Sequence, residues 1–161
     1  MNVAPISRRS FLASAAGGVL ALTVSPAAAW QARFAVVRTD AEWRRRLTAD
    51  QYAALRKGAT ERPGSSPFNR EKRRGTYHCA GCSQALFRSQ TKFESGTGWP
   101  SFYAPIGGAM GTRPDRSEAE VRTEVHCARC GGHRGHVFND GPRPTGLRYC
   151  MNGVALRFRA S

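Results

Sequence analysis

The last third of the chain holds one cysteine, Cys150, that has no second cysteine at metal-binding spacing. Arg148 stands two residues before it and Asn152 stands two residues after it. On a strand, side chains two positions apart point to the same face, so these three groups would share one surface. A guanidinium beside a thiol favours the thiolate, which is the nucleophilic form. The spacing therefore predicts a nucleophile with a lowered pKa, and the alternative is a small buried core residue.

Two histidines, His133 and His136, precede this cysteine in a glycine-rich stretch. That much glycine disfavours a helix. In a regular strand, residues three apart face opposite ways, so a shared pocket requires a bulge, which glycine permits. A single histidine is usually a structural residue, but two histidines near a lone cysteine indicate one reactive site.

The other four cysteines form two Cys-x-x-Cys pairs, Cys79 with Cys82 and Cys127 with Cys130. Four thiolates are the tetrahedral ligand set of closed zinc sites, and such a site leaves no position for substrate. The alternative is a pair of disulfides, which an oxidising compartment allows. We favour a structural zinc, because a protein that folds before export takes up its metal in a reducing compartment.

The first part of the chain resembles an export signal of the twin-arginine type. The Arg8-Arg9 pair is followed by an apolar run of small residues, and residues 26–29 offer a small-residue cleavage site before Trp30. The run is too weakly apolar for a membrane span, which needs about 20 apolar residues. We therefore expect a signal peptide at 1–29, one folded domain at 30–161, and a periplasmic protein.

The composition restricts the possible partners. The chain has 161 residues, 40% of them hydrophobic, and a formal charge of +14, which suggests one basic globular domain. Such a charge permits binding to nucleic acid or anionic lipid. The basic residues form no dense tract with interleaved aromatics, and export would remove the protein from nucleic acid. A zinc-ribbon module that binds nucleic acid and an exported zinc or redox carrier are the rival hypotheses.

The hydrophobic pattern divides the chain into a helical part and a part with short strands. Residues 39–58 are typical of two helices, which Thr39 and Thr48 can cap. Residues 60–75 and 107–117 are typical of loops. Strands are expected near 75–78, 84–88, 92–93, 120–126, 135–138, 147–152 and 154–158. The pattern predicts a mainly β fold, a compact antiparallel sandwich or barrel with short N-terminal helices.

Four ordered motifs resemble the B-type methionine sulfoxide reductases, also called peptide-methionine (R)-S-oxide reductases. The motifs are Cys-Ala-Gly-Cys at 79–82, Ser-Gly-Thr-Gly-Trp-Pro-Ser-Phe at 95–102, Cys-Ala-Arg-Cys-Gly-Gly-His-Arg-Gly-His-Val-Phe at 127–138 and Gly-Leu-Arg-Tyr-Cys-Met-Asn at 146–152. The similarity extends over about 39–158. It implies a fold of two antiparallel sheets with peripheral helices and a structural zinc on the four paired cysteines. It also implies reduction of the R epimer of methionine sulfoxide.

The resemblance assigns a role to each reactive group. Cys150 would attack the sulfoxide sulfur as a thiolate, which Arg148 would favour. His136 would be the main general acid that protonates the departing oxygen, with His133 beside it, a role worth about 10²–10⁴-fold in rate. Cys150 would then be left as a sulfenic acid. Asp140 would either pair with Arg148 or orient a histidine.

The resemblance also implies a binding pocket and the partners of the enzyme. Trp99 and Phe138 would form an apolar wall for the S-methyl group, and Asn152 would position the substrate. The expected partners are oxidised proteins that contain methionine sulfoxide and a thioredoxin-like thiol reductant, and we expect a monomer. The chain departs from the family twice: Thr97 stands where many members have a second, resolving cysteine, and Gly153 stands where serine is common.

Overall fold

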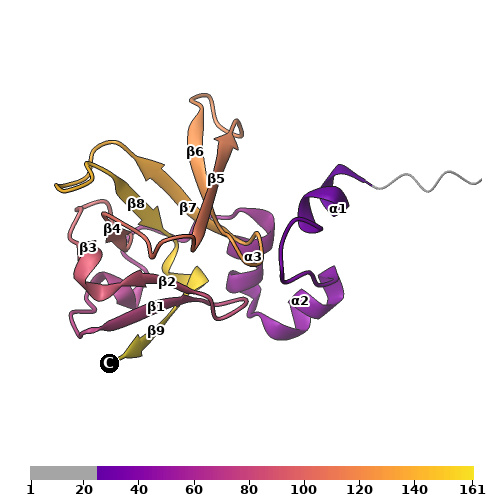
Figure 1. The fold of residues 1–161 in the computed structure, drawn as a ribbon, viewed down its shortest axis with the longest axis horizontal. Coiled ribbons are helices and arrows are strands. Elements are labelled where there is room, and N and C mark those ends of the chain that lie inside the picture. Colours follow the sequence, from indigo (N-terminus) through magenta and orange to yellow (C-terminus); the bar gives the residue numbers. More distant parts are fainter. Residues whose placement is uncertain (1–24) are drawn as a thin grey trace, which may run out of the picture.

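The computed structural model describes residues 25–161, and the twin-arginine motif and its apolar run lie outside the described residues. The short helix α1 (Pro26–Gln31) comes first, and the expected cleavage position before Trp30 falls within it. Within residues 25–161, no helix is long and apolar enough to cross a membrane. Figure 1 shows α1 and α2 beside the strands, and α3 between them and the two sheets.

Helices α2 (Asp40–Arg46) and α3 (Ala49–Lys57) confirm the helical prediction for 39–58. Each helix begins with a capping box, in which Thr39 or Thr48 accepts a backbone N–H three residues later. Gly58 ends α3, as expected from its position. The apolar faces of both helices are buried, so packing against the strands adds to what the caps provide.

The strands form two antiparallel sheets. The first sheet has the order β2 (Ala85–Arg88), β1 (Gly75–Cys79) and β9 (Leu156–Ala160). The second sheet has the order β3 (Lys92–Phe93), β4 (Ser101–Phe102), β8 (Arg148–Met151), β7 (His133–Phe138), β6 (Arg122–Cys127) and β5 (Met110–Asp115). Three short 3₁₀ helices, η1 (Pro67–Asn69), η2 (Ser89–Thr91) and η3 (Gly153–Ala155), lie in the connecting segments. The mainly β prediction with two antiparallel sheets is confirmed.

The prediction of a loop at 107–117 is wrong, because this segment contains strand β5. Among the strands of residues 25–161, β5 lies at the edge of its sheet and pairs with β6 alone, from Met110 opposite Cys127 to Asp115 opposite Arg122. An edge strand needs no apolar alternation, and it tolerates a proline such as Pro114. The hydrophobic pattern therefore carried no signal for this strand.

Aromatic side chains join the two sheets in the core. Phe87 of β2 stacks on Phe102 of β4 with ring centres 4.2 Å apart. Tyr77 of β1 meets the same Phe102 ring edge-on at 4.9 Å. All three side chains are fully buried. This contact fixes β4, which is the strand that pairs with the cysteine-bearing strand β8.

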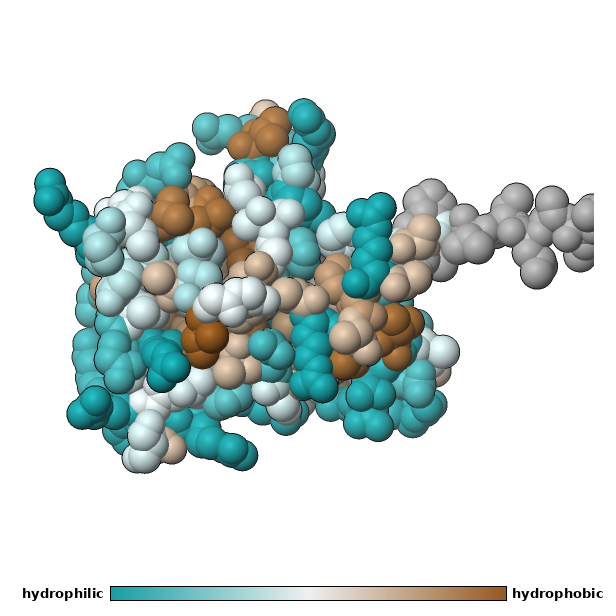
Figure 2. Space-filling model, viewed as in Figure 1, coloured by the Kyte–Doolittle hydropathy of each residue, from teal (hydrophilic) through white to brown (hydrophobic). Residues whose placement is uncertain are grey.

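The surface is mostly hydrophilic on the face drawn in Figure 2, where apolar residues form small separate groups. Among the described residues, the large hydrophobic side chains that are exposed are Val37 and Val121. Val121 lies at the turn between β5 and β6, and its chain neighbour Arg122 lines the pocket described below.

Candidate active site and metal centre

Strand register brings Cys150 and His136 together. Strand β7 pairs with β8 so that His136 is directly opposite Cys150. On its other side β8 pairs with β4, where Ser101 is opposite the same cysteine. Side chains of directly opposed residues lie on the same face of an antiparallel pair, with Cβ atoms about 4.5–5.5 Å apart. The two predicted reactive groups therefore face one space.

A bulge in β7 places His133 beside His136, although His133 lines a different cavity from the one that Cys150 and His136 line. The register against β6 shifts between Val125 opposite Gly135 and His126 opposite His133, which leaves Arg134 as the extra residue. Gly135 has a φ of 142° and packs so closely on β8 that a Cβ would overlap the carbonyl of Cys150. Only glycine fits there. As a result the rings of His133 and His136 lie 5.5 Å apart.

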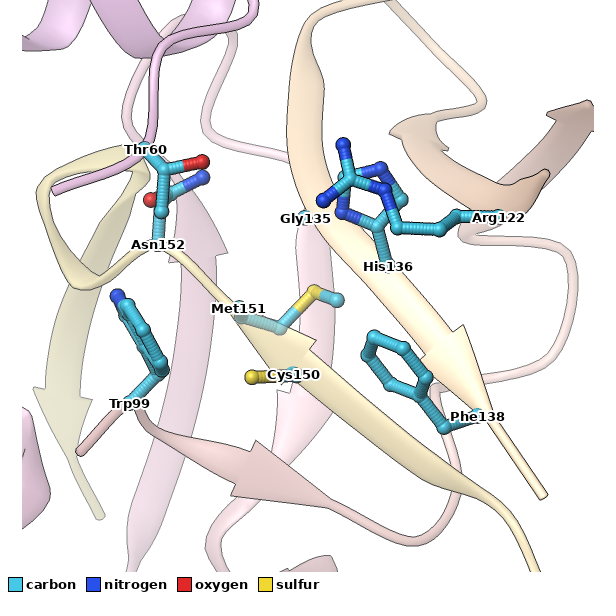
Figure 3. A pocket seen from close by; sticks show the side chains of 9 residues that line it. All are labelled: Thr60, Trp99, Arg122, Gly135, His136, Phe138, Cys150, Met151 and Asn152. Atoms are coloured by element: carbon cyan, nitrogen blue, oxygen red, sulfur yellow. The ribbon is translucent and has the colours of Figure 1, made fainter. Parts of the chain in front are cut away.

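A pocket of about 120 Å³ opens at this place. It is lined by Thr60, Trp99, Arg122, Gly135, His136, Phe138, Cys150, Met151 and Asn152. Five of the predicted site residues are in that set. Trp99, Thr60 and Asn152 lie on one side of Cys150, and His136, Arg122 and Phe138 lie on the other (Figure 3). A small apolar group bound here would lie between aromatic rings and beside a thiol.

The expectation of a lowered pKa for Cys150 is wrong. Burial raises the pKa of this thiol, and contacts with Thr97 and Arg148 offset only part of that effect. The free energy cost of removing a thiolate from water exceeds the stabilisation that the nearby guanidinium of Arg148 provides, because that guanidinium already has a carboxylate partner. The free site therefore favours the thiol over the thiolate.

Arg148 acts from behind the pocket wall and does not line it. Its guanidinium donates two hydrogen bonds to the carboxylate of Asp140, at 2.9 Å and 2.8 Å. The pairing of these two residues was one of the two roles expected for Asp140. The guanidinium also lies over the ring of Phe138, 4.4 Å from its centre. It thus supports the aromatic wall while placing a positive charge near Cys150.

Each histidine has a carboxylate partner that the sequence did not suggest. A ring nitrogen of His136 lies 2.7 Å from an oxygen of Asp115, and His133 lies 2.8 Å from Glu124. Burial lowers the pKa of His136, although the bond to Asp115 acts in the opposite direction. Burial alone would raise the pKa of Glu124, but His133 and Arg113 bring it to about 2. Both histidines are therefore oriented by ionised carboxylates.

Asn152 is 2% exposed, and both ends of its amide are engaged. Its oxygen accepts the backbone N–H of Glu61 at 2.9 Å, and its nitrogen donates to the carbonyl of Arg134 at 3.3 Å. These bonds fix the edge of the amide that lines the pocket. Asn152 is thus a rigid wall residue, and it ties the segment after α3 to the sheet.

Thr97 lies next to the candidate nucleophile. Its hydroxyl oxygen is 3.9 Å from the sulfur of Cys150. The same hydroxyl lies 2.8 Å from that of Ser95, which in turn lies 2.7 Å from that of Ser101. A chain of hydroxyl groups therefore holds the glycine-rich loop against β8, with position 97 directed to the thiol.

The four paired cysteines form a cluster that can hold a metal ion. Their sulfur atoms all lie within 4.8 Å of one another, with Cys79 and Cys130 at 3.7 Å and Cys82 and Cys127 at 3.6 Å. A tetrahedron with metal–sulfur bonds of about 2.3 Å has sulfur atoms roughly 3.8 Å apart. All five cysteines are free thiols, so the alternative of two disulfides is not what this structure contains.

Backbone and side-chain donors complete this cluster. The N–H groups of Gly81 and Cys82 donate to the sulfur of Cys79 at 3.3 Å and 3.1 Å. The fully buried Arg134 also donates to that sulfur, and it donates to the carbonyl of Ala155 at 2.9 Å. A divalent ion neutralises only half the charge of four thiolates, so a buried guanidinium suits the set. The donors fit a closed, sulfur-only metal site.

Several residues of the site left no signal in the sequence that pointed to it. They are Thr60, Glu61, Arg122 and the carboxylates of Asp115 and Glu124. No fixed spacing relates them to Cys150, because they reach the site from a loop and from two neighbouring strands. For Arg122 and Glu124, the one available signal was that they are charged residues within the strand expected at 120–126.

Comparisons with known proteins agree with these observations. A family model described as the SelR domain matches residues 47–160. A peptide methionine sulfoxide reductase MsrB of Leptospira interrogans is 49% identical over 127 residues, which cover 78% of this chain and 97% of that protein. The MsrB of Pseudomonas putida strain W619 is 56% identical over 123 residues, 76% of this chain and 92% of the relative. The MsrB of Agrobacterium fabrum is 51% identical with the same coverage of both chains.

Proposed function

The chain belongs to the peptide methionine sulfoxide reductase MsrB family, and we propose that it reduces the R epimer of methionine sulfoxide in proteins through Cys150. The observation that supports this assignment most directly is the register of β7 and β8. It sets a free thiol opposite an imidazole inside a pocket with aromatic walls. A nucleophile, a proton donor and an apolar wall are the parts that sulfoxide reduction needs.

The first step is attack of the Cys150 thiolate on the sulfoxide sulfur. His136, as imidazolium, gives its proton to the sulfoxide oxygen, and the sulfur–oxygen bond of the substrate breaks. The attack joins the two sulfur atoms by a bond. The protonated oxygen then passes from the substrate sulfur to the sulfur of Cys150 as this bond between the sulfurs breaks, and the electron pair of that bond stays on the substrate sulfur. Cys150 is left as a sulfenic acid, and the substrate leaves as a thioether. The cysteine sulfur is oxidised by two electrons and the substrate sulfur is reduced by two, so the step balances.

The pocket walls select the group that reacts. Trp99 and Phe138 receive the S-methyl group between them, and burial of that group orients the sulfur toward Cys150. The Asn152 amide contributes a rigid polar edge, because both of its ends are already hydrogen-bonded. His133 supports His136 from the adjacent position on the bulge.

Regeneration uses a thiol from outside the chain. Cys79, Cys82, Cys127 and Cys130 form the metal cluster, and position 97 carries a hydroxyl, so no resolving thiol faces Cys150 within the described residues. The sulfenic acid condenses with an external thiol to give water and a mixed disulfide. A second thiol then releases Cys150. A thioredoxin-like protein supplies both thiols.

The cluster of four cysteines holds a structural zinc in this proposal. When bound, the ion cross-links two distant parts of the chain and contributes folding free energy, on the order of 10–16 kcal/mol apparent in small zinc domains. With four protein ligands it has no free position for substrate. Two of its ligand residues, Cys79 and Cys127, end strands β1 and β6, which belong to different sheets.

The chain acts in the periplasm after twin-arginine export of the folded protein. The support is the Arg8-Arg9 pair with its apolar run in residues 1–29. A thiolate-bound metal would be acquired before export, in the reducing cytoplasm. Fractionation of cells that express the full chain, beside an Arg8→Lys, Arg9→Lys variant that should remain in the cytoplasm, tests this placement.

A steady-state assay with resolved epimers tests the reaction. The wild-type protein should reduce a peptide R sulfoxide with a dithiol and should leave the S epimer unchanged. Cys150→Ser should be inactive while it retains its metal and its melting temperature. Equal turnover of both epimers, or turnover by Cys150→Ser, would reject the proposal.

A further inference from the structure

Glu61 has no catalytic group of its own in the mechanism above, yet all of its polar groups bond to residues that form or adjoin the pocket. Its backbone N–H donates to the amide oxygen of Asn152 at 2.9 Å. Its backbone carbonyl accepts the indole N–H of Trp99 at 3.0 Å. Its two carboxylate oxygens accept the backbone N–H groups of Gly153 and Val154, at 2.6 Å and 3.0 Å.

These four bonds meet on one side of the pocket. Trp99 and Asn152 both lie on the side of Cys150 that carries Thr60, the chain neighbour of Glu61 (Figure 3). They belong to separate parts of the sequence, one in the glycine-rich loop and one after β8. Within residues 25–161, Trp99 and Asn152 share no hydrogen bond, and each bonds to Glu61 instead. The backbone of Glu61 therefore links them.

The carboxylate is what holds that backbone in place. A charged acceptor that bonds two consecutive N–H groups makes shorter and stronger hydrogen bonds than a neutral acceptor. The contacts of Gly153 also explain why glycine stands here where serine is common in the family. A Cβ at this position would overlap the hydroxyl of the buried Ser66. The glycine lets the loop that carries Glu61 and Ser66 close on the start of η3.

We propose that Glu61 is a positioning residue, which sets the spacing between Trp99 and Asn152 and so the fit of the methionine sulfoxide side chain. This inference rests on the proposed function, since it takes both residues to be substrate contacts. Its carboxylate acts through the backbone, not on the substrate. Losing it lets the loop move, and the pocket wall becomes less well defined while Cys150 and His136, held by β7 and β8, stay in register.

The test compares Glu61→Gln with a matched variant, Glu42→Gln. Glu42 also accepts a backbone N–H, that of Thr39 at 2.8 Å, but it caps α2 and does not line the pocket. A glutamine keeps the size of the side chain and has one acceptor oxygen, so one N–H after β8 loses its partner. For the R sulfoxide peptide we expect KM to rise about tenfold in Glu61→Gln, with a smaller change in kcat. Glu42→Gln should keep the wild-type KM.

Two further readouts separate positioning from loss of fold. Alkylation of Cys150 by iodoacetamide needs neither Trp99 nor Asn152, so its rate should be unchanged in Glu61→Gln. In a double-mutant cycle, the losses of kcat/KM caused by Glu61→Gln and by Trp99→Phe should sum to more than the loss in the double variant. The reason is that both substitutions disturb the same side of the pocket. If the glutamine variant folds poorly, Glu61→Asp replaces it in the double-mutant cycle with Trp99→Phe, because the shorter side chain of aspartate cannot reach both N–H groups equally.

The outcomes distinguish the inference from the function on which it rests. An unchanged KM, full additivity with Trp99→Phe, or a parallel fall in alkylation would overturn the positioning role even in an active reductase. If the wild-type protein reduces no sulfoxide, the function fails, but the indole can still be followed. In that case a shift of the NMR resonance of the Trp99 indole N–H in Glu61→Gln, absent in Glu42→Gln, supports the link between Glu61 and Trp99, and no shift overturns it.

Discussion

The imidazole of His136 lies 2.7 Å from the carboxylate of Asp115, a residue two strands away at the end of β5. Ser117 and then His136 hold the pKa of that carboxyl well below its usual range, so Asp115 is ionised. The ionised carboxylate favours the imidazolium that must donate a proton. Asp115→Asn should therefore lower the pKa of His136 further and slow sulfenic acid formation at neutral pH by about tenfold. Single-turnover kinetics measure this rate.

The matched control for Asp115 is Glu118→Gln. Glu118 also pairs with Arg122, but the carboxylate bonded to His136 is that of Asp115, so removal of Glu118 should leave the single-turnover rate near that of the wild type. If Asp115→Asn is as fast as the wild type at every pH, the carboxylate has no part in proton transfer.

The rate of sulfenic acid formation should depend on pH in two limbs, because the proton donor His136 has a lower pKa than the nucleophile Cys150. Burial lowers the pKa of His136 below its ordinary 6.5 and raises that of Cys150 above its ordinary 9.0. The reactive form, thiolate with imidazolium, is then a minor form whose amount is greatest between the two values. The rate of sulfenic acid formation should therefore rise with pH through a midpoint that lies below 6.5, level off, and fall through a midpoint that lies above 9.0.

Substitution of the histidines tests which group forms this profile. His136→Asn should be about 10²–10⁴-fold slower and should show only a rise with pH, as the thiolate forms. His133→Asn should be less impaired and should keep the two-limbed profile. A two-limbed profile that persists in His136→Asn would place the acid elsewhere.

The charge of Arg148 can be separated from its packing. Arg148→Met removes the positive charge near Cys150, so the pKa of the thiol should rise and alkylation at pH 7 should slow by several-fold. Arg148→Lys keeps a charge but loses the paired hydrogen bonds to Asp140, so its alkylation rate should lie between those of the wild type and Arg148→Met. Iodoacetamide kinetics from pH 6 to 10 measure the shift. Identical alkylation curves for the three proteins would remove Arg148 from thiolate stabilisation.

The metal cluster should control stability and not chemistry. Cys79→Ser or Cys130→Ser leaves three thiolates, so we expect loss of zinc and a large fall in melting temperature. Arg134→Leu should lose zinc to a chelator faster than the wild type, because the buried charge beside the thiolates is gone. Elemental analysis measures the zinc content of the cysteine variants, and the rate of zinc release to a chelator is measured for Arg134→Leu. Cys150→Ser, which should retain its zinc, is the control for both measurements. A metal-free wild-type protein with two disulfides would contradict this account.

Local sequence was sufficient for much of the fold. The caps of α2 and α3 depend on residues three apart, and the two Cys-x-x-Cys pairs identify the metal cluster by spacing alone. The bulge at 133–136 follows from glycine beside two histidines. Strand β5 could not be recognised, because none of its six residues is buried and an edge strand needs no apolar alternation.

The carboxylates of the site could not be predicted for a different reason. Asp115, Glu124 and Glu61 approach the pocket residues through strand pairing and loop packing, which no spacing in the sequence records. The prediction of a lowered pKa for Cys150 is wrong because an arginine two residues away is visible in the sequence, whereas burial of the thiol is not. The sequence shows which groups are neighbours on a strand, and the structure adds the cost of their desolvation.

The most direct test of the central claim is a single turnover without reductant. Wild-type protein is mixed with excess peptide R sulfoxide, and both the methionine formed and the state of Cys150 are determined by mass spectrometry. The account predicts one methionine per chain, one added oxygen atom on Cys150 and no cross-link to any other cysteine, since the nearest side chain in the loop is Thr97. A disulfide between Cys150 and one of the four cluster cysteines, or methionine formed while Cys150 stays a free thiol, would contradict it.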